Sequence, residues 1–328
     1  MSITVEAGQE ADGGKVAPRR RRHWLSWLIV VFLAGWAVVR VTGAESGSFL
    51  TQLMTLTPYS PVPALIVAVA LVRRDRRAAI VALAACVTLA ATVLPRAFAA
   101  GEPATGGTSF KVLTINLFGR ADARAVVELV RRLQPDVFSA LELTYAQVAA
   151  LDAAGLPALL PHRVLLDERG ASGSGLYGRH PLRELHGLFT PIGHNMPAAE
   201  VSLPSGVKVE VVAVHPNPPL GRMVEEWNAS LAALPPPTTG PIRVLAGDFN
   251  ASLDHRAMRD LLAKGYHDAA RQVGQALTPT WPNVRVMPPF ITIDHVLADR
   301  RAGVRAVEVL DVPGTDHRGV FAELRLPS

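Results

Sequence analysis

The chain has 328 residues, enough for one or two domains, and 49% of them are apolar. Its formal charge is +5, and much of the basic excess comes from two arginine clusters, not from a basic stripe of the kind that binds nucleic acid. The single cysteine, Cys86, excludes a disulfide framework and a cysteine zinc site, which leaves a reducing compartment or an oxidising compartment with a cysteine-poor domain.

Residues 1–22 are polar and end in the cluster Arg19–Arg22, so we expect a disordered, basic cytoplasmic tail. Three apolar segments then predict transmembrane helices within residues 23–96, at about 24–41, 49–72 and 78–95. A spanning helix needs about 20 apolar residues. The first and third segments meet this length, whereas the second does so only with its proline-bearing half. A cleaved signal peptide is the alternative for the first, and its long basic lead-in argues against it.

The arginines also predict the orientation of these helices. Arg19–Arg22 precede the first segment, and Arg73, Arg74, Arg76 and Arg77 lie between the second and third. With three spans, both clusters face the cytoplasm, as the positive-inside rule requires. Everything after the third span is then extracytoplasmic. If the second segment is only re-entrant, the following domain is cytoplasmic and one cluster faces the wrong side.

Residues 97–108 are small and rich in glycine and proline, which indicates a linker. Residues 109–328 predict one domain in which short strands alternate with helices, and hence a layered α/β sandwich. The expected strands are 110–116, 137–143, 207–214, 242–246, 291–297 and 320–326, and the expected helices are 121–133 and 221–234.

Polar residues follow or interrupt these apolar strands again and again. Each alone is ordinary, because a polar residue at a strand end is usually a turn or surface residue. The set, however, has the composition of a site for phosphoryl chemistry. Its members are Asn116, Glu142, His215, Asp248, Asn250, Asp294, His295, Asp316 and His317. No serine elbow, phosphate-binding P-loop or HExxH motif is present.

Each step of that chemistry has suitable residues. Glu142 and Asp316, with Asn116 nearby, offer the oxygen ligands that Mg²⁺ prefers. Asp248 and the amide of Asn250 suit a group that orients or deprotonates water. His215 and His317 can donate to phosphoryl oxygens. Asp294 can orient His317 and keep it protonated.

Four motifs carry a resemblance to a known family. They are SGSGLYGRHPL (172–182), LAGDFNAS (245–252), IDHVLA (293–298) and TDHRGV (315–320). In this order they resemble the endonuclease/exonuclease/phosphatase superfamily. The resemblance implies a four-layer αββα sandwich and assigns Mg²⁺ or Mn²⁺ to Asn116, Glu142 and Asp316. It also implies that Asp248 activates water, Asn250 and His215 contact the phosphate, and Asp294 pairs with His317.

The chain is also similar to membrane-anchored actinobacterial members of this superfamily that are linked to teicoplanin resistance. This similarity implies an extracytoplasmic enzyme at the cell membrane, with the bilayer and a lipid-linked or small phosphorylated substrate as partners. Undecaprenyl pyrophosphate of cell-wall synthesis is the expected substrate. The alternatives are a membrane-anchored nuclease, which the few lysines of the domain disfavour, and a non-catalytic binding module.

Overall fold

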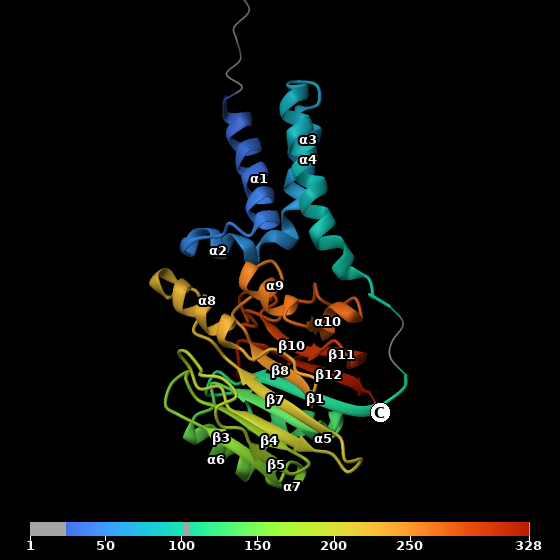
Figure 1. Cartoon of the computed structure of the whole chain (residues 1–328). Coiled ribbons are helices and arrows are strands. Elements are labelled where there is room, and N and C mark those ends of the chain that lie inside the picture. Colours follow the sequence, from blue (N-terminus) through green and yellow to red (C-terminus); the bar gives the residue numbers. More distant parts are fainter. Residues whose placement is uncertain (1–23, 102–104, 328) are drawn as a thin grey trace, which may run out of the picture.

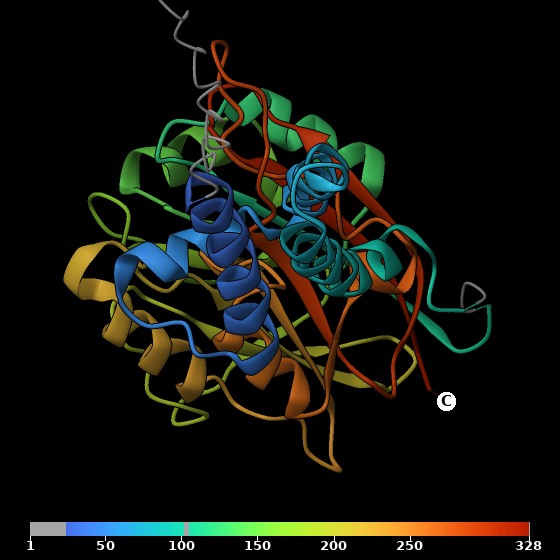
Figure 2. The same cartoon turned by 90° about the horizontal axis from the view of Figure 1, so that it is seen from above.

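The computed structural model describes residues 24–101 and 105–327, in which a helical stalk projects from one end of a two-sheet domain (Figure 1). The predicted tail, residues 1–22, lies outside the described residues, as do three residues of the predicted linker. Figure 2 looks down on this arrangement and shows the stalk helices standing over the domain.

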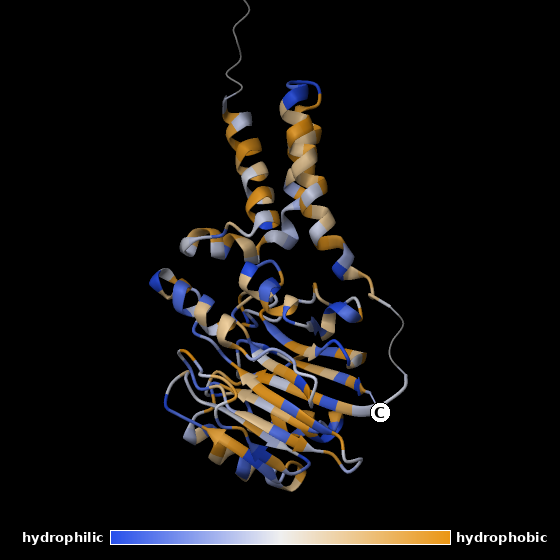
Figure 3. Ribbon diagram, viewed as in Figure 1, coloured by the Kyte–Doolittle hydropathy of each residue, from blue (hydrophilic) through white to orange (hydrophobic). Residues whose placement is uncertain are grey.

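The stalk contains the apolar helices. Within the described residues, two helices are long and apolar enough to cross a membrane: α1 (Trp24–Thr42), and α4 (Arg76–Val93) with its short extension η2 (Leu94–Ala97). Their residues are mostly hydrophobic (Figure 3), and their exposed side chains include Leu28, Phe32, Ile80 and Val87. The first and third predicted segments therefore form helices of spanning length.

The second predicted segment, residues 49–72, is not one helix. It forms α2 (Gly47–Thr55), the single turn η1 (Thr57–Tyr59) and α3 (Pro61–Leu71), with a bend of 54°. Pro58 and Pro61 lie at the start of η1 and α3, where proline is tolerated because the first backbone N–H groups of a helix have no partner there. An 11-residue α3 is only about 16 Å long. The three-span expectation therefore depends on treating this bent pair as one span.

The start of α1 and the loop between α3 and α4 lie together at the end of the stalk that is far from the domain (Figure 1). The indole N–H of Trp27, in the first turns of α1, donates to Asp75 at 2.9 Å. Asp75 also caps α4, accepting from the backbone N–H groups of Arg77 and Ala78. The start of α1 and the arginine-bearing loop between α3 and α4 therefore lie side by side.

The domain contains two six-stranded sheets. The first has the order β11-β12-β1-β2-β4-β3 and the second the order β5-β6-β7-β8-β10-β9. The first comprises β1 (Thr108–Asn116), β2 (Val137–Leu141), β3 (His162–Leu166), β4 (Ser174–Gly178), β11 (Gly303–Asp311) and β12 (Arg318–Leu326). The second comprises β5 (Leu182–Glu184), β6 (Ala198–Ser202), β7 (Lys208–Val214), β8 (Ile242–Asp248), β9 (Tyr266–Asp268) and β10 (Asp294–Asp299).

Three apolar clusters show how the layers stack. One cluster lies between the sheets and includes Val112, Val137, Val211 and Val244. A second joins the outer face of the first sheet to α5 (Ala123–Leu133), α6 (Tyr145–Ala153) and α7 (Leu156–Leu159). The third joins the second sheet to α8 (Val224–Ala233) and α9 (Arg256–Ala263). The short helix α10 (Ala269–Gln272) follows β9, and the turn η3 (Gly221–Met223) precedes α8. This confirms the mixed two-sheet fold expected from the sequence.

A buried ion cluster attaches the stalk to the domain. Asp254, which precedes α9, accepts from Arg40 at 2.5 Å and from Arg96 at 2.6 and 2.7 Å. Arg40 ends α1 and Arg96 follows α4, so one carboxylate joins both helices to the domain. The guanidinium of Arg259 also donates to the carbonyl oxygen of Arg40 at 2.7 Å. Because all three members of the ion cluster are buried, the relative position of stalk and domain is closely constrained.

Candidate active site

The directions of the strands bring the candidate site residues to one edge of the two sheets. β1 and β2 are parallel, as are β7 and β8, so their carboxyl ends lie at a common edge. β10 runs antiparallel to β8, which places Asp294 at its start directly opposite Asp248 at the end of β8. β12 runs antiparallel to β1, so His317 just before β12 lies beside Asn116 at the end of β1. Residues far apart in the chain thus meet at one edge of the two sheets.

One pocket of about 290 Å³ contains most of them. Its lining includes Glu142, His215, Asp248, Asn250, Asp316 and His317. Asn116 is fully buried behind these residues, and its amide Nδ2 donates to Glu142 at 3.1 Å and to Asp248 at 3.2 Å. Apart from His295, the structure therefore brings the predicted site residues together, with Asn116 as the link between the two sheets.

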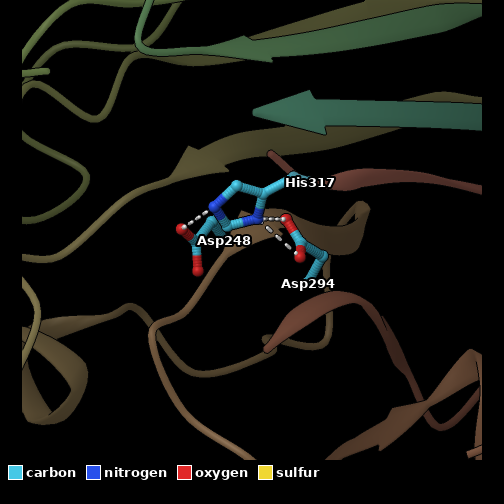
Figure 4. Close-up of side chains that lie close together, drawn as sticks. All are labelled: Asp248, Asp294 and His317. Atoms are coloured by element: carbon cyan, nitrogen blue, oxygen red, sulfur yellow. Dashed lines mark hydrogen bonds and ion pairs between the residues drawn. The ribbon is translucent and has the colours of Figure 1, made fainter. Parts of the chain in front are cut away.

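Asp294 and His317 form a buried pair. The Nδ1 atom of His317 lies 2.9 Å from a carboxylate oxygen of Asp294, and its Nε2 atom lies 3.7 Å from Asp248 (Figure 4). Burial alone would lower the pKa of His317, but the charges of Asp294 and Asp248 outweigh it and raise that pKa to about 10. His317 is therefore an imidazolium at neutral pH, as expected of a donor to phosphoryl oxygens.

Asp248 has the properties of a base. Burial raises the pKa of its carboxyl to about 7, against the opposing effect of His317. A general base is most effective when its pKa lies near the working pH. Its Oδ1 accepts from the backbone N–H of Asn250 at 2.8 Å, which holds the carboxylate in place.

Two residues of the site have left-handed backbone conformations. Glu142 has a φ of 49° and Asn250 a φ of 48°. Such conformations are uncommon for residues other than glycine and are found at functional sites. At Glu142 the turn follows β2 directly, and burial raises the pKa of its carboxyl above the ordinary value.

The donor set fits a divalent cation. Asp316 has one carboxylate oxygen that accepts from the indole of Trp281 at 3.2 Å. Its other oxygen, Oδ1, is buried and has no hydrogen-bond partner among the described residues. A buried oxygen without a donor indicates a missing partner. Asn116, Glu142 and Asp316 would supply the oxygen ligands that Mg²⁺ or Mn²⁺ takes.

A second set also places three potential ligand atoms within 4.8 Å of one another: Asp248, Asp294 and His317. A metal there would require a neutral His317, because an imidazolium has no lone pair to offer. The two carboxylates favour the protonated ring. That Asn116, Glu142 and Asp316 hold the cation therefore stays a prediction from the sequence.

His194 was not expected from the sequence. It lies in the loop before β6, follows no strand, and so carries no signal that the sequence could reveal. Its ring nitrogen lies 3.2 Å from that of His215. Burial, together with His194 and His317, holds the pKa of His215 well below its ordinary value. His215 is therefore neutral and differs in charge from His317.

His295, which the sequence placed among the candidates, does not line the pocket. Neighbouring strand residues point to opposite faces, so His295 turns away from the site that Asp294 faces. Its Nδ1 lies 2.8 Å from Asp268 and its Nε2 lies 2.9 Å from the carbonyl oxygen of Ala251. Both partners are acceptors, so both ring nitrogens must donate and the ring must be charged. This pair is structural.

A pH-dependent stability follows from His295. Burial lowers the pKa of His295, but Asp268 outweighs this and raises it above 6.5. The stabilisation is therefore complete below the unfolded pKa and is lost as the pH rises through the folded value. We expect His295→Leu to lower the free energy of unfolding by about 3–5 kcal/mol, because Asp268 is left buried without its counter-charge. Thermal unfolding of the full chain between pH 6 and 9 measures this.

The control for this prediction is His186→Leu. His186 is exposed and lies 3.7 Å from Glu184. Such surface pairs contribute about 0–1 kcal/mol. If both variants lose the same small amount, or if the wild-type protein becomes more stable from pH 6 to 9, the assignment of His295 as an imidazolium is wrong.

Residues 113–317 match the family model described as the endonuclease/exonuclease/phosphatase family. Among solved structures, a protein of that description from Beutenbergia cavernae DSM 12333 has 22% identity and a TM-score of 0.54, over 67% of this chain and 72% of that one. Humanized D. rerio TDP2 has 16% identity and a TM-score of 0.51, over 66% and 99%. At these identities the structures show a shared fold. No curated protein matches the sequence.

Proposed function

This chain belongs to the endonuclease/exonuclease/phosphatase family, and from that premise we propose a metal-dependent phosphohydrolase that is anchored in the cell membrane with its site outside the cytoplasm. Membership of the family makes it a hydrolase of phosphate esters. The observation that carries the rest of the proposal is the pocket itself, which is lined by the site residues and also by Gln52 and Thr55 of α2 in the stalk.

The residues divide the reaction between them. Asp248 accepts a proton from the attacking water, and Asn250 and the neutral His215 orient the phosphoryl group. His317, held protonated by Asp294, donates to an oxygen that gains negative charge as the phosphorus–oxygen bond of the leaving group breaks. A divalent cation held by Asn116, Glu142 and Asp316 would neutralise phosphoryl charge.

The proposal also names a class of substrate. The resemblance to the teicoplanin-resistance protein VanJ, together with a stalk whose helices could cross a membrane, favours a lipid-linked phosphate such as undecaprenyl pyrophosphate. Cleavage of that anhydride by water releases inorganic phosphate and leaves the lipid monophosphate. A contribution to teicoplanin resistance would follow from a change in the supply of that lipid carrier.

The direct test is phosphate release by the purified full-length protein from a polyprenyl pyrophosphate. We expect release with Mg²⁺ and a fall to background with EDTA, since the cation lowers the charge on the phosphoryl group. Restoring Mg²⁺ should restore the activity. Release that persists in EDTA contradicts the metal assignment. Plasmid DNA in the same assay tests the alternative, because rapid nicking without pyrophosphate cleavage would make the protein a nuclease.

Topology needs its own test. The start of α1 and the loop of Arg73–Arg77 lie together at the end of the stalk remote from the domain (Figure 1). The positive-inside rule then favours a cytoplasmic location for that end and an extracytoplasmic one for the domain. A reporter that is active only outside the cytoplasm, fused after Ala104, should be active. Activity of a cytoplasm-only reporter at that position would reverse the proposed orientation.

A further inference from the structure

The catalytic pocket has a second part that the chemistry above does not use. Beside the polar residues, its lining includes Gln52 and Thr55 of α2, Leu220 of the loop after β7, and Trp281 and Ile291 of the hairpin before β10. Most of these side chains are apolar, and none is suited to a step of phosphate cleavage. A pocket that combines polar and apolar lining residues favours an amphiphilic ligand.

Helix α2 is held firmly against the domain. Gln52 donates to the carbonyl oxygen of Pro219 at 3.0 Å, and the hydroxyl of Ser48 accepts from the N–H of Gly221 at 3.2 Å. His255 lies 2.9 Å from the carbonyl oxygen of Thr51. Since its other nitrogen accepts from the N–H of Ser252 at 2.8 Å, the proton on Nε2 is fixed and donates to α2. Three separate contacts therefore fix this wall of the pocket.

The same helix belongs to the stalk. It connects α1 to α3 and lies across the base of the helices that could cross a membrane (Figures 1 and 3). Met54 is buried in the apolar cluster that α1 and α4 share, whereas Phe49 is 71% exposed. The loop beside α2 likewise exposes Leu220 to 57%. A helix with this position and exposed apolar side chains is typical of the membrane–water interface.

We propose that α2 and Leu220 form the subsite for the apolar chain of a membrane-lipid phosphate, with Gln52 and Thr55 as specificity-determining residues. The inference rests on the proposed function and adds what recognises the substrate. The phosphate occupies the part of the pocket near Asp248 and Asp316, and the chain beyond its first isoprenoid unit lies along α2. The occupant is a lipid because the wall that holds it is continuous with helices able to enter the bilayer.

The key variant is Thr55→Trp, which fills the side of the pocket that α2 lines. Thr92→Trp on α4 is the matched control. Both threonines are half-buried, and each bonds a carbonyl oxygen of its own helix, at 2.6 Å for Thr55 and 2.8 Å for Thr92. Thr92 does not line the pocket. Leu220→Ser is a second variant on an exposed loop, where failure to fold is not a concern.

Hydrolysis of two pyrophosphates by the full-length protein in one detergent tests the proposal. Farnesyl pyrophosphate has a long chain, and dimethylallyl pyrophosphate has a short one with the same reacting bond. For Thr55→Trp we expect kcat/KM on the farnesyl compound to fall about tenfold or more, because the methylene contacts are blocked. The dimethylallyl value should stay within about twofold, since its chain ends before the blocked region. Leu220→Ser should change the ratio in the same direction, and Thr92→Trp should leave it unchanged.

The outcomes separate the two proposals. Equal losses on both substrates, or no loss on either, would overturn the subsite while leaving a phosphohydrolase intact. A wild-type protein that hydrolyses neither pyrophosphate would contradict the proposed function, and the subsite with it. A farnesyl value that never exceeds the dimethylallyl value in wild-type protein would also overturn the subsite.

Discussion

Replacing Asp248 by asparagine is expected to reduce phosphate release about 10²–10⁴-fold, the usual contribution of a positioned general base. The amide preserves the shape of the side chain but cannot accept the proton. Because Asn250 donates to Asp248 at 2.8 Å, the oxygen that remains can keep this contact. The fold should survive, and the loss should appear in kcat. Initial rates with saturating Mg²⁺ and lipid pyrophosphate measure the effect.

Asp299→Asn is the control for Asp248→Asn. Asp299 ends β10, in the same sheet, and its side chain is as buried as that of Asp248, but it pairs with Arg301 outside the pocket. We expect some loss of stability and a nearly unchanged rate per folded molecule. A similar fall in rate for both variants would show that Asp248 acts through the fold and not through the reaction.

Asp254→Asn should destabilise the protein strongly. The substitution leaves Arg40 and Arg96 buried without their counter-charge. Breaking a buried ion pair by removing one partner costs about 3–5 kcal/mol. We therefore expect a lower thermal midpoint for the full-length protein in detergent. Because α2 is positioned through the same interface, activity on a long-chain pyrophosphate should also fall.

The pH dependence of this effect has a defined sign. Burial raises the pKa of Asp254, but Arg96 and Arg40 outweigh burial, so its pKa lies below the ordinary value. The stabilisation is present above the unfolded carboxyl pKa of about 3.9 and is lost as the pH falls through the lower folded value. The difference between variant and wild type should thus be the same at pH 6 and pH 8 and shrink in strong acid.

Asp152→Asn supplies the comparison for Asp254→Asn. Asp152 pairs with Arg163 at 2.9 Å, and both side chains are partly accessible to solvent. The expected cost is about 0–1 kcal/mol. A loss for Asp254→Asn no greater than this would mean that stalk and domain are held together mainly by other contacts.

The sequence predicted secondary structure best where the residue pattern was regular, in continuous apolar runs and in the periodic helix. Val112 and Val137 lie in apolar runs that were predicted as strands and form β1 and β2. The helix predicted over 121–133 is α5, capped by Asp122. Less regular strands were missed: β11 alternates exposed and buried residues only loosely, and β5 has three residues. Such strands are stabilised mainly by contacts with neighbouring strands, so their own residue pattern is a weak guide to strand formation.

The break in the second apolar segment shows a different limit. Its prolines were visible, yet hydropathy alone could not decide between a kinked span and separate helices. Contacts accompany the bend: Trp36 donates to the hydroxyl of Thr57 at 3.1 Å, and Tyr59 donates to the carbonyl oxygen of Phe290 at 2.6 Å. These partners are far apart in the sequence. A helix that turns to meet them could not be anticipated from residues 49–72.

For the candidate site, the sequence could name the residues but not their protonation states. Asn116, Glu142, Asp248 and His317 could be named from the sequence because polar residues at the ends of apolar strands are unusual as a set, and because their motifs resemble those of a family. Their charges could not be assigned in this way. The protonation of His317, the raised pKa of Asp248 and the neutrality of His215 depend on burial and on neighbours from other strands.

By itself, then, the sequence indicated a layered α/β domain, the apolar helices before it and a set of candidate site residues, and its motifs implied the two sheets through their resemblance to a family. Local residue pattern and motif order carry that information. Only the tertiary structure decided that His295 is structural, that His194 joins the site, and that α2 lines the catalytic pocket. Each of these depends on contacts between segments distant in the chain, which exist only once the stalk and both sheets have packed together.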